Sequence, residues 1–211
     1  LISFVLAVLI TPFFMNIGIN LGLYDKPDFR RKHSKPTPRI GGLAIFSAGL
    51  LSILLINYLP KNFVHDFAYV GNNKIFLIFF MGLLTFFFIG LADDIFTLSP
   101  IPRLGAQIIS CSLLWFLGLR IDNLDFIFQY NLNNFISLIL TVIWISGVTN
   151  AINWLDGLDG LASGVTSISF LNLSTISFHN GNILAGTISL ILAGSCIGFL
   201  SLNFSPAKIF M

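Results

Sequence analysis

The stretch Ile75-Phe-Leu-Ile-Phe-Phe-Met-Gly-Leu-Leu-Thr-Phe-Phe-Phe-Ile-Gly-Leu-Ala-Asp-Asp94 decides the fold class of this chain. Its apolar part, residues 75–92, is long enough to cross a bilayer core of about 30 Å as a helix. The run ends at two adjacent carboxylates, Asp93 and Asp94. The C-terminal end of a helix carries a partial negative charge, so two anions are costly there unless a cation or a proton transfer stabilises them. The stretch therefore predicts polar chemistry at a membrane surface.

The composition is that of a membrane protein. Hydrophobic residues make up 55% of the chain and charged residues 9%, whereas a soluble domain carries about 25% charged residues. The net charge of +2 gives no reason to expect a nucleic-acid partner. Cys111 and Cys196 both lie in apolar runs. Their spacing fits neither a zinc site nor a disulfide framework, so we expect two buried free thiols.

Seven apolar segments predict an all-α, polytopic transmembrane bundle of about seven spanning helices, in a single integral membrane domain over residues 1–211. Each segment approaches the ~20 residues that a spanning helix needs. The first run is not expected to be a signal peptide, because its positive residues follow the apolar core instead of preceding it. The chain begins inside an apolar run without Met, so we expect a fragment. The segments are 1–19, 41–59, 75–92, 103–119, 134–150, 161–178 and 183–203.

The Lys and Arg residues fall unequally on the two sides of this topology. One side receives eight and the other three, and the positive-inside rule places the first side in the cytoplasm. The chain has nine Asp and no Glu, and four of the Asp fall in two short clusters on that same side. This concentration of acid predicts a functional site at the cytoplasmic face, with both clusters lining one cleft.

The second cluster has a polar side chain at every third residue. Its members are Asn150, Asn153, Asp156 and Asp159. Gly157 and Gly160 predict that the helix ends here. Amide and carboxylate oxygens suit Mg²⁺, which binds through one or two carboxylates and substrate phosphates; Mn²⁺ is the alternative ion. The alternative interpretation is a pair of solvated Asp-Gly turns without a role. The spacing does not match an EF-hand loop.

The Asp93–Asp94 pair also has a structural alternative. One of the two Asp could cap the next helix. Ser99 and the prolines Pro100 and Pro102 are better start signals for that helix, which we expect near Arg103. A functional role for the pair is therefore favoured over capping.

The segment between the first two apolar runs is basic and then stiff. Residues 26–39 hold six Lys or Arg, which suits anionic lipid head groups or a substrate phosphate. Plain positive-inside topology is an equal alternative for residues 30–32, and a solvated His33 is as expected as a functional one. Pro36 and Pro38 fix an extended backbone. The Gly pair at 41–42 opens the next helix and lets backbone approach a ligand closely.

Together these residues carry a resemblance. The sequence Lys32-His-Ser-Lys-Pro-Thr-Pro-Arg-Ile-Gly-Gly42, then Gly90-Leu-Ala-Asp-Asp94, then Asn150-Ala-Ile-Asn-Trp-Leu-Asp-Gly-Leu-Asp-Gly-Leu-Ala162 resembles the polyprenyl-phosphate N-acetylhexosamine-1-phosphate transferases, glycosyltransferase family 4. The resemblance covers nearly the whole chain. The Pro-Thr-Pro-Arg-Ile-Gly-Gly form is more similar to the branch that uses UDP-GlcNAc for cell-envelope glycans, such as lipopolysaccharide or teichoic acid, than to the phospho-MurNAc-pentapeptide branch.

The resemblance implies a reaction in a bacterial plasma membrane. The phosphate of polyprenyl (undecaprenyl) phosphate attacks the sugar-bearing phosphorus of a UDP-sugar, and UMP leaves. Mg²⁺ would be bound by Asn153 with Asp94, and Asp93 and Asp94 would position or deprotonate the lipid phosphate. Asp156 and Asp159 would line the nucleotide pocket. The full set of substrate-binding residues that it implies is Lys35, Arg39, Arg103, Asn150, Asp156 and Asp159.

The sequence departs from this family at its end. In the family, the sequence resembling residues 203–211 runs into Gly-Asp-x-Gly-Ser, which supplies another metal-binding Asp, and a His-rich loop comes later. Neither is present, so we expect incomplete metal coordination in this fragment. The rival function is an ion-coupled secondary transporter, whose acids lie near the bilayer midplane, and a third is a membrane scaffold without catalysis. A homodimer is left open.

Overall fold

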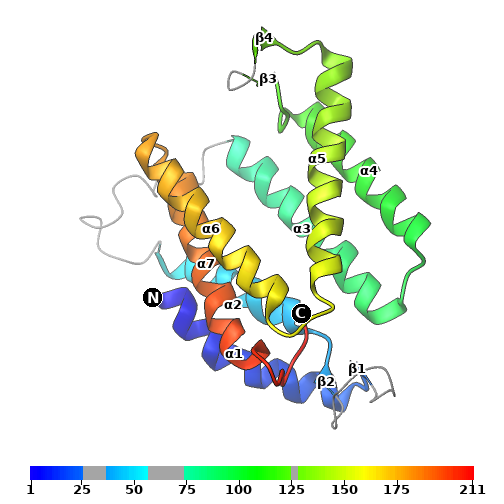
Figure 1. The fold of residues 1–211 in the computed structure, drawn as a ribbon, viewed down its shortest axis with the longest axis vertical. Coiled ribbons are helices and arrows are strands. Elements are labelled where there is room, and N and C mark those ends of the chain that lie inside the picture. Colours follow the sequence, from blue (N-terminus) through cyan, green and yellow to red (C-terminus); the bar gives the residue numbers. More distant parts are fainter. Residues whose placement is uncertain (26–36, 57–73, 125–127) are drawn as a thin grey trace. The chain divides into compact units, whose positions relative to one another are not determined.

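In the described part of the chain, a computed structural model has seven helices and two short β-ribbons (Figure 1). The structure describes residues 1–25, 37–56, 74–124 and 128–211. The helical architecture confirms the all-α prediction. The helices are α1 (Ile2–Asn20), α2 (Gly41–Ile56), α3 (Lys74–Phe96), α4 (Pro100–Leu117), α5 (Asn134–Leu155), α6 (Leu161–His179) and α7 (Ile183–Asn203), and the strands are β1 (Tyr24–Asp25), β2 (Thr37–Pro38), β3 (Asn123–Leu124) and β4 (Phe128–Asn131).

Six of the seven helices are long and apolar enough to cross a membrane, and the protein is multi-pass. The exception is α2, whose 16 residues fall just short. Several helices extend beyond their predicted apolar runs. α3 continues past residue 92 to Phe96, so the Asp pair is helical. α4 begins at Pro100, since Ser99 takes the N-cap position and Pro occupies the first turn, a position where its missing N–H costs nothing. α5 continues past residue 150 to Leu155, so the polar residues Asn150 and Asn153 are helical.

The chain divides into two compact units, which are residues 1–70 with 153–211 and residues 71–152. In the first unit, α7 packs against α1, α2 and α6. Small residues allow the close approach to α1. A Cβ on Gly198 would lie 2.5 Å from the Phe4 carbonyl oxygen and 2.8 Å from the Ala7 Cβ. Helices in a membrane associate through such packing, because lipid is as apolar as their side chains.

The chain end is anchored in the first unit. The Phe210 N–H donates to the Pro38 carbonyl at 2.8 Å, and the Phe210 carbonyl accepts from the Gly41 N–H at 2.9 Å. Gly41 opens α2, as predicted. The close approach that we expected toward a ligand is made to the chain itself, because a Cβ on Gly41 would meet the Phe199 ring and the Phe210 carbonyl. Residues 204–211 are thereby held against the start of α2.

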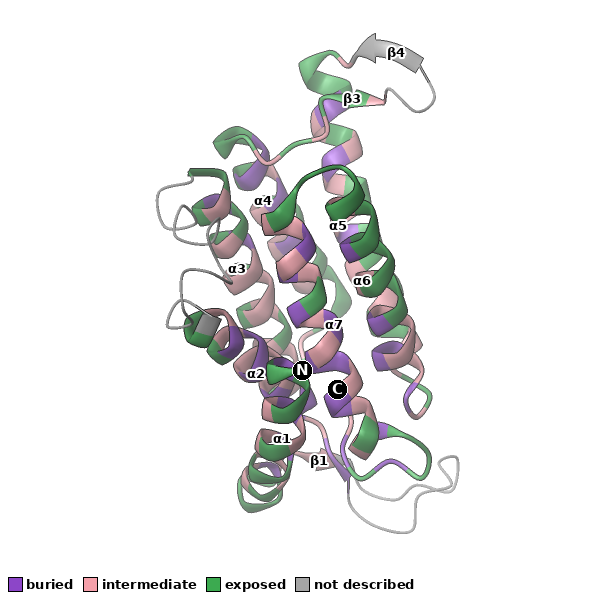
Figure 2. Cartoon of the chain, turned by 90° about the vertical axis from the view of Figure 1, so that its left-hand side faces the viewer, coloured by how far each residue is buried: buried purple, intermediate pink, exposed green. Residues whose placement is uncertain are grey.

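The second unit contains α3, α4, α5 and the ribbon of β3 and β4. α3 packs along α4, and the Trp115 indole N–H of α4 donates to the Ser137 hydroxyl of α5 at 2.8 Å. α5 carries exposed residues along much of its length (Figure 2), as expected for a helix that faces lipid. The antiparallel ribbon of β3 and β4 lies between α4 and α5. The thiols of Cys111 in this unit and Cys196 in the other are free and buried, as predicted.

Candidate functional site

The Asp pair lies in the last turn of α3, at the helix end where the sequence placed it. The Asp93 Oδ2 accepts a hydrogen bond from the Arg103 Nη1 at 2.6 Å, and the two side chains are 19% and 18% exposed. Arg103 lies in the first turn of α4, which starts at Pro100. Arg103, which the resemblance implied as a substrate-binding residue, is therefore paired with Asp93. The ion pair relieves the charge repulsion between Asp93 and the end of α3.

Arg103 keeps further donors. A guanidinium has five N–H groups, and the Arg103 Nε is buried without a hydrogen-bond partner in the described part of the chain. A buried unpaired donor is costly, which fits an anion as the group that completes this site. Asp94 is half-buried and interacts within the chain. Ser99 occupies the N-cap position of α4, where the sequence placed the start signal.

Asn150 is fixed by two hydrogen bonds in the last turns of α5. Its Nδ2 donates to the Ser146 carbonyl of the preceding turn at 2.8 Å. It also donates to the Gln107 Oε1 of α4 at 2.6 Å. Gln107 is 3% exposed. The sequence interpretation missed this residue, although its spacing from Arg103 by four residues puts both on one face of α4.

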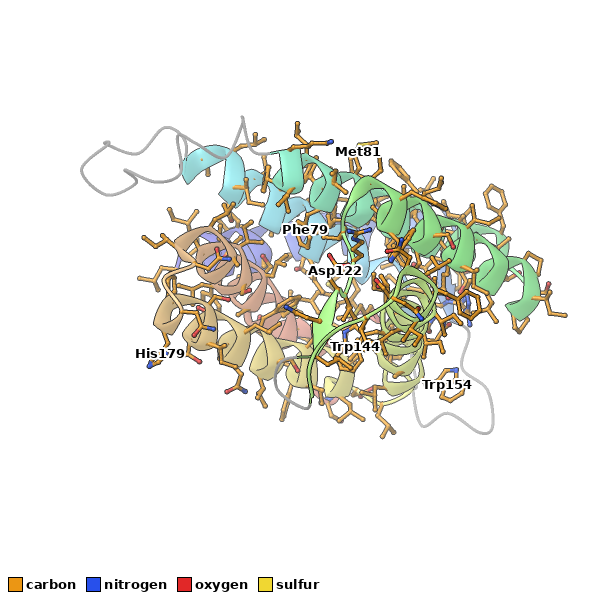
Figure 3. The ribbon with its side chains drawn as sticks, turned by 90° about the horizontal axis from the view of Figure 1, so that it is seen from above. Phe79, Met81, Asp122, Trp144, Trp154 and His179 are labelled. Carbon is orange, nitrogen blue, oxygen red and sulfur yellow. The ribbon has the colours of Figure 1, made fainter. Side chains whose placement is uncertain are left out.

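Asn153 and Trp154 are exposed where α5 ends. Trp154 is 81% exposed, and its side chain points away from α5 (Figure 3). Exposed Trp at a helix end is typical of a membrane–water interface. The place of the Asn153 amide at a membrane face stays a prediction.

Asp156 and Asp159 lie in the turn between α5 and α6, where Gly157 and Gly160 predicted a break. Gly160 takes a φ of +70°, in the left-handed region that favours Gly. The Asp159 Oδ2 accepts from the Ala207 N–H at 3.0 Å, so this carboxylate holds the segment that follows α7. Asp156 is half-buried and interacts within the chain. The predicted contact of both carboxylates with a nucleotide stays a prediction.

A second polar contact anchors the same segment. Asn203 is 2% exposed, and its Oδ1 accepts from the Ser163 hydroxyl at 2.7 Å. Its Nδ2 donates to the Ile209 carbonyl at 2.8 Å. The sequence did not predict these hydrogen bonds of Asn203, since its partners Ser163 and Ile209 lie forty residues earlier and six residues later in the chain. The turn after α5 and the chain end are therefore parts of one hydrogen-bonded network.

Of the six Lys and Arg residues of the basic segment 26–39, Arg39 alone is among the described residues. Lys35, with residues 30–33, lies outside the described residues. Arg39 follows β2 and is half-buried, and its N–H donates to the Leu23 carbonyl at 3.1 Å. β2 confirms the extended backbone that Pro38 predicted. The substrate contacts predicted for Lys35 and Arg39 stay predictions.

The donor chemistry fits a hard cation. Asp94 and Asn153 both lie in the last turn of a helix, α3 and α5 respectively, where unsatisfied carbonyls favour positive charge. Their side-chain oxygens are the ligand type that Mg²⁺ prefers. Within the described ranges, no group of three or more His, Cys, Asp or Glu lies close enough to hold a metal. The convergence of the two acidic clusters in one cleft stays a prediction.

Comparison with known proteins gives consistent matches. The model of the family described as glycosyl transferase family 4 matches residues 76–211. The probable undecaprenyl-phosphate N-acetylglucosaminyl 1-phosphate transferase of Bacillus subtilis is 32% identical over all of this chain and 56% of its own length. The decaprenyl-phosphate N-acetylglucosaminephosphotransferase of Mycolicibacterium smegmatis is 32% identical over 92% of this chain and 50% of its own length. The phospho-N-acetylmuramoyl-pentapeptide-transferase of Clostridium beijerinckii is 30% identical over the whole chain and 67% of its length. The chain thus spans about half the length of the first two.

Proposed function

The chain belongs to glycosyl transferase family 4, and from this membership we propose that the whole protein is a polyprenyl-phosphate sugar-1-phosphate transferase. The donor is a UDP-sugar, with UDP-GlcNAc favoured, and the acceptor is undecaprenyl phosphate. The observation that carries the proposal is the family match over residues 76–211, which includes both acidic clusters. Two of the relatives described above are named as GlcNAc-1-phosphate transferases, which supports the choice of sugar.

The proposed reaction exchanges one P–O bond for another. An oxygen of the lipid phosphate bonds to the sugar-bearing phosphorus of the UDP-sugar, the diphosphate P–O bond breaks, and UMP leaves with its electron pair. The sugar stays on the lipid through a diphosphate. Phosphoryl transfer depends mostly on positioning and on neutralising charge, so the protein must bring two anionic substrates together.

Asp93 and Asp94 have different roles in this proposal. Asp93 is held by Arg103, and this pair sets the position of the last turn of α3. Asp94 then positions the lipid phosphate or removes its remaining proton. The unpaired Nε of Arg103 donates to a phosphate oxygen, and Lys35 and Arg39 supply further positive charge. An acid or base positioned in this way contributes about 10²–10⁴-fold to the rate.

Asn153 and Asp94 carry the oxygens proposed to bind Mg²⁺, with Mn²⁺ as a substitute. When bound, the ion would act as a Lewis acid on the phosphoryl oxygens. Asn150, Asp156 and Asp159 are proposed to contact the nucleotide. The Asp159 carboxylate also holds the Ala207 N–H, which keeps the turn after α5 in a defined conformation.

The site is proposed to face the cytoplasm of a bacterial inner membrane. The Lys and Arg count favours this side, and the donor is a soluble nucleotide. The relatives described above are bacterial. Because the lipid acceptor stays in the bilayer, a site at a helix end lets both substrates meet at the surface.

The experiment that tests this function uses membranes from cells that express the full-length protein. They are incubated with Mg²⁺, undecaprenyl phosphate and either sugar-labelled UDP-GlcNAc or labelled UDP-MurNAc-pentapeptide. We expect labelled lipid and an equal amount of UMP from UDP-GlcNAc. Product from the muramoyl substrate alone would place the protein in the other branch. Uptake of label without lipid product would indicate a transporter and refute the proposal.

A further inference from the structure

The contact between Gln107 and Asn150 links α4 to α5 through two side-chain amides. Gln107 is buried at 3% exposure, and its Oε1 lies 2.6 Å from the Asn150 Nδ2. A buried amide in an apolar helix costs free energy unless it is hydrogen-bonded. The hydrogen bond with Asn150 offsets the cost of burying the Gln107 amide.

The orientation of both amides follows from the backbone. The Asn150 Nδ2 lies 2.8 Å from the Ser146 carbonyl, which can only accept, so this side of the Asn150 amide must be the nitrogen. Because a nitrogen can only donate, the Gln107 atom that faces it must be the oxygen. Hydrogen-bond networks of this kind are the physical basis for assigning amide orientations. Both Asn150 N–H groups are then used, and the Asn150 Oδ1 accepts no hydrogen bond in the described part of the chain.

We propose that Gln107 is a positioning residue, which holds the Asn150 amide so that its Oδ1 is the acceptor offered to the UDP-sugar. This inference rests on the proposed function. A fixed oxygen recognises an N–H or O–H donor, and the UDP-sugar has both kinds, in the uracil ring and on the sugar. A site whose polar group is oriented in advance binds more tightly, because the substrate does not have to order it.

The place of Gln107 on α4 supports this role. It lies four residues after Arg103, on the same face of the helix. Arg103 holds Asp93 of α3, and Gln107 holds Asn150 of α5. One face of α4 therefore fixes residues from both neighbouring helices that the proposed reaction uses. If Gln107 served packing alone, it would not need to accept a hydrogen bond from Asn150, a residue proposed to contact the substrate.

The test is steady-state kinetics of the full-length protein with UDP-GlcNAc and undecaprenyl phosphate. Gln107→Met keeps the length of the side chain but removes the acceptor. Gln107→Glu keeps an acceptor oxygen in the same place. We expect Gln107→Met to raise KM for UDP-GlcNAc by about tenfold, the factor for loss of about one net hydrogen bond. Gln107→Glu should stay within about threefold of the parent, and KM for the lipid phosphate should change in neither.

Two further variants separate positioning from folding. Asn150→Ala combined with Gln107→Met should raise KM no further than Asn150→Ala alone, since contacting residues are coupled. Asn172→Leu on α6 is the matched control. It also removes an amide from an apolar helix, but the Asn172 Nδ2 donates to the Ile168 carbonyl of its own helix. We expect its KM values to equal those of the parent.

Several results would overturn the inference. An unchanged KM for UDP-GlcNAc in folded Gln107→Met would do so, and so would equal defects in the Met and Glu variants. If Gln107→Met does not fold, Asn150→Asp decides the matter. It keeps an acceptor oxygen but removes the nitrogen that Gln107 fixes, so normal KM in this variant would refute positioning. No lipid product from the parent protein would instead refute the proposed function, and this inference with it.

Discussion

The ion pair between Asp93 and Arg103 should stabilise the protein measurably. The perturbation is a double-mutant cycle with Asp93→Ala, Arg103→Ala and the double variant, made in the full-length protein. Removing either residue leaves a mostly buried charge without its partner, so each single variant should be destabilised. The double variant should lose less than the sum of the two, because no unpaired charge remains.

The size of the coupling can be worked from the contact. Two charges about 4 Å apart interact by about 4 kcal/mol at an effective dielectric of about 20, before the cost of desolvation. Fully exposed pairs contribute about 0.2–1 kcal/mol, and hydrogen bonds to charged groups about 1.5–3 kcal/mol. The Asp93 and Arg103 side chains are 19% and 18% exposed and 2.6 Å apart. We therefore expect a coupling free energy of about 2 kcal/mol, near the middle of the charged range.

The assay is the free energy of unfolding of each purified variant in mixed detergent micelles. The control is a second cycle on Arg120 and Asp122, an ion pair of 2.9 Å whose side chains are 37% and 57% exposed. Its coupling should stay below about 1 kcal/mol. If the Asp93–Arg103 coupling is no larger than that of the control pair, Arg103 does not hold Asp93, and the reasoning on the α3 end is wrong.

Two further predictions concern the first unit. Gly198→Ala should lower the free energy of unfolding by about 1–3 kcal/mol, since the new Cβ would lie 2.5 Å from the Phe4 carbonyl oxygen. The control Gly164→Ala should leave the free energy of unfolding unchanged, because a Cβ there meets nothing within 4 Å. Equal losses in the two variants would contradict the close packing of α7 against α1. Asp159→Ala removes the acceptor of the Ala207 N–H, so hydrogen exchange at this amide should rise on the order of tenfold, and unchanged exchange would show that the carboxylate does not hold the chain end.

The helices and their ends were largely predictable. Long apolar runs identify spanning helices by length alone. Specific residues marked the boundaries. Ser99 and the following prolines signalled the start of α4, although the helix was expected near Arg103 and begins at Pro100. Gly157 and Gly160 marked the break between α5 and α6. The backbone hydrogen bonds of a helix do not depend on apolar side chains, so α5 continues through Asn153 although its apolar pattern stops earlier.

The partners of the polar residues were not predictable in the same way. Most of these helices are apolar on all sides, so hydropathy does not show which face meets which neighbour. The pairing of Ser163 with Asn203 and the packing of Gly41 against Phe199 depend on tertiary contacts between distant segments. α4 is the exception. Its residues Arg103, Gln107, Cys111 and Trp115 recur every four positions on one face, and this spacing could have identified Gln107.

The most direct test of the account compares full-length protein with its Asp94→Asn variant in a transfer assay. Labelled lipid and UMP are both measured, with UDP-GlcNAc, undecaprenyl phosphate and Mg²⁺ at saturation. We predict that the parent forms both products in equal amounts and that Asp94→Asn lowers turnover by about 10²–10⁴-fold, with its free energy of unfolding little changed. Near-normal turnover by Asp94→Asn would contradict the claim that this carboxylate takes part in the reaction.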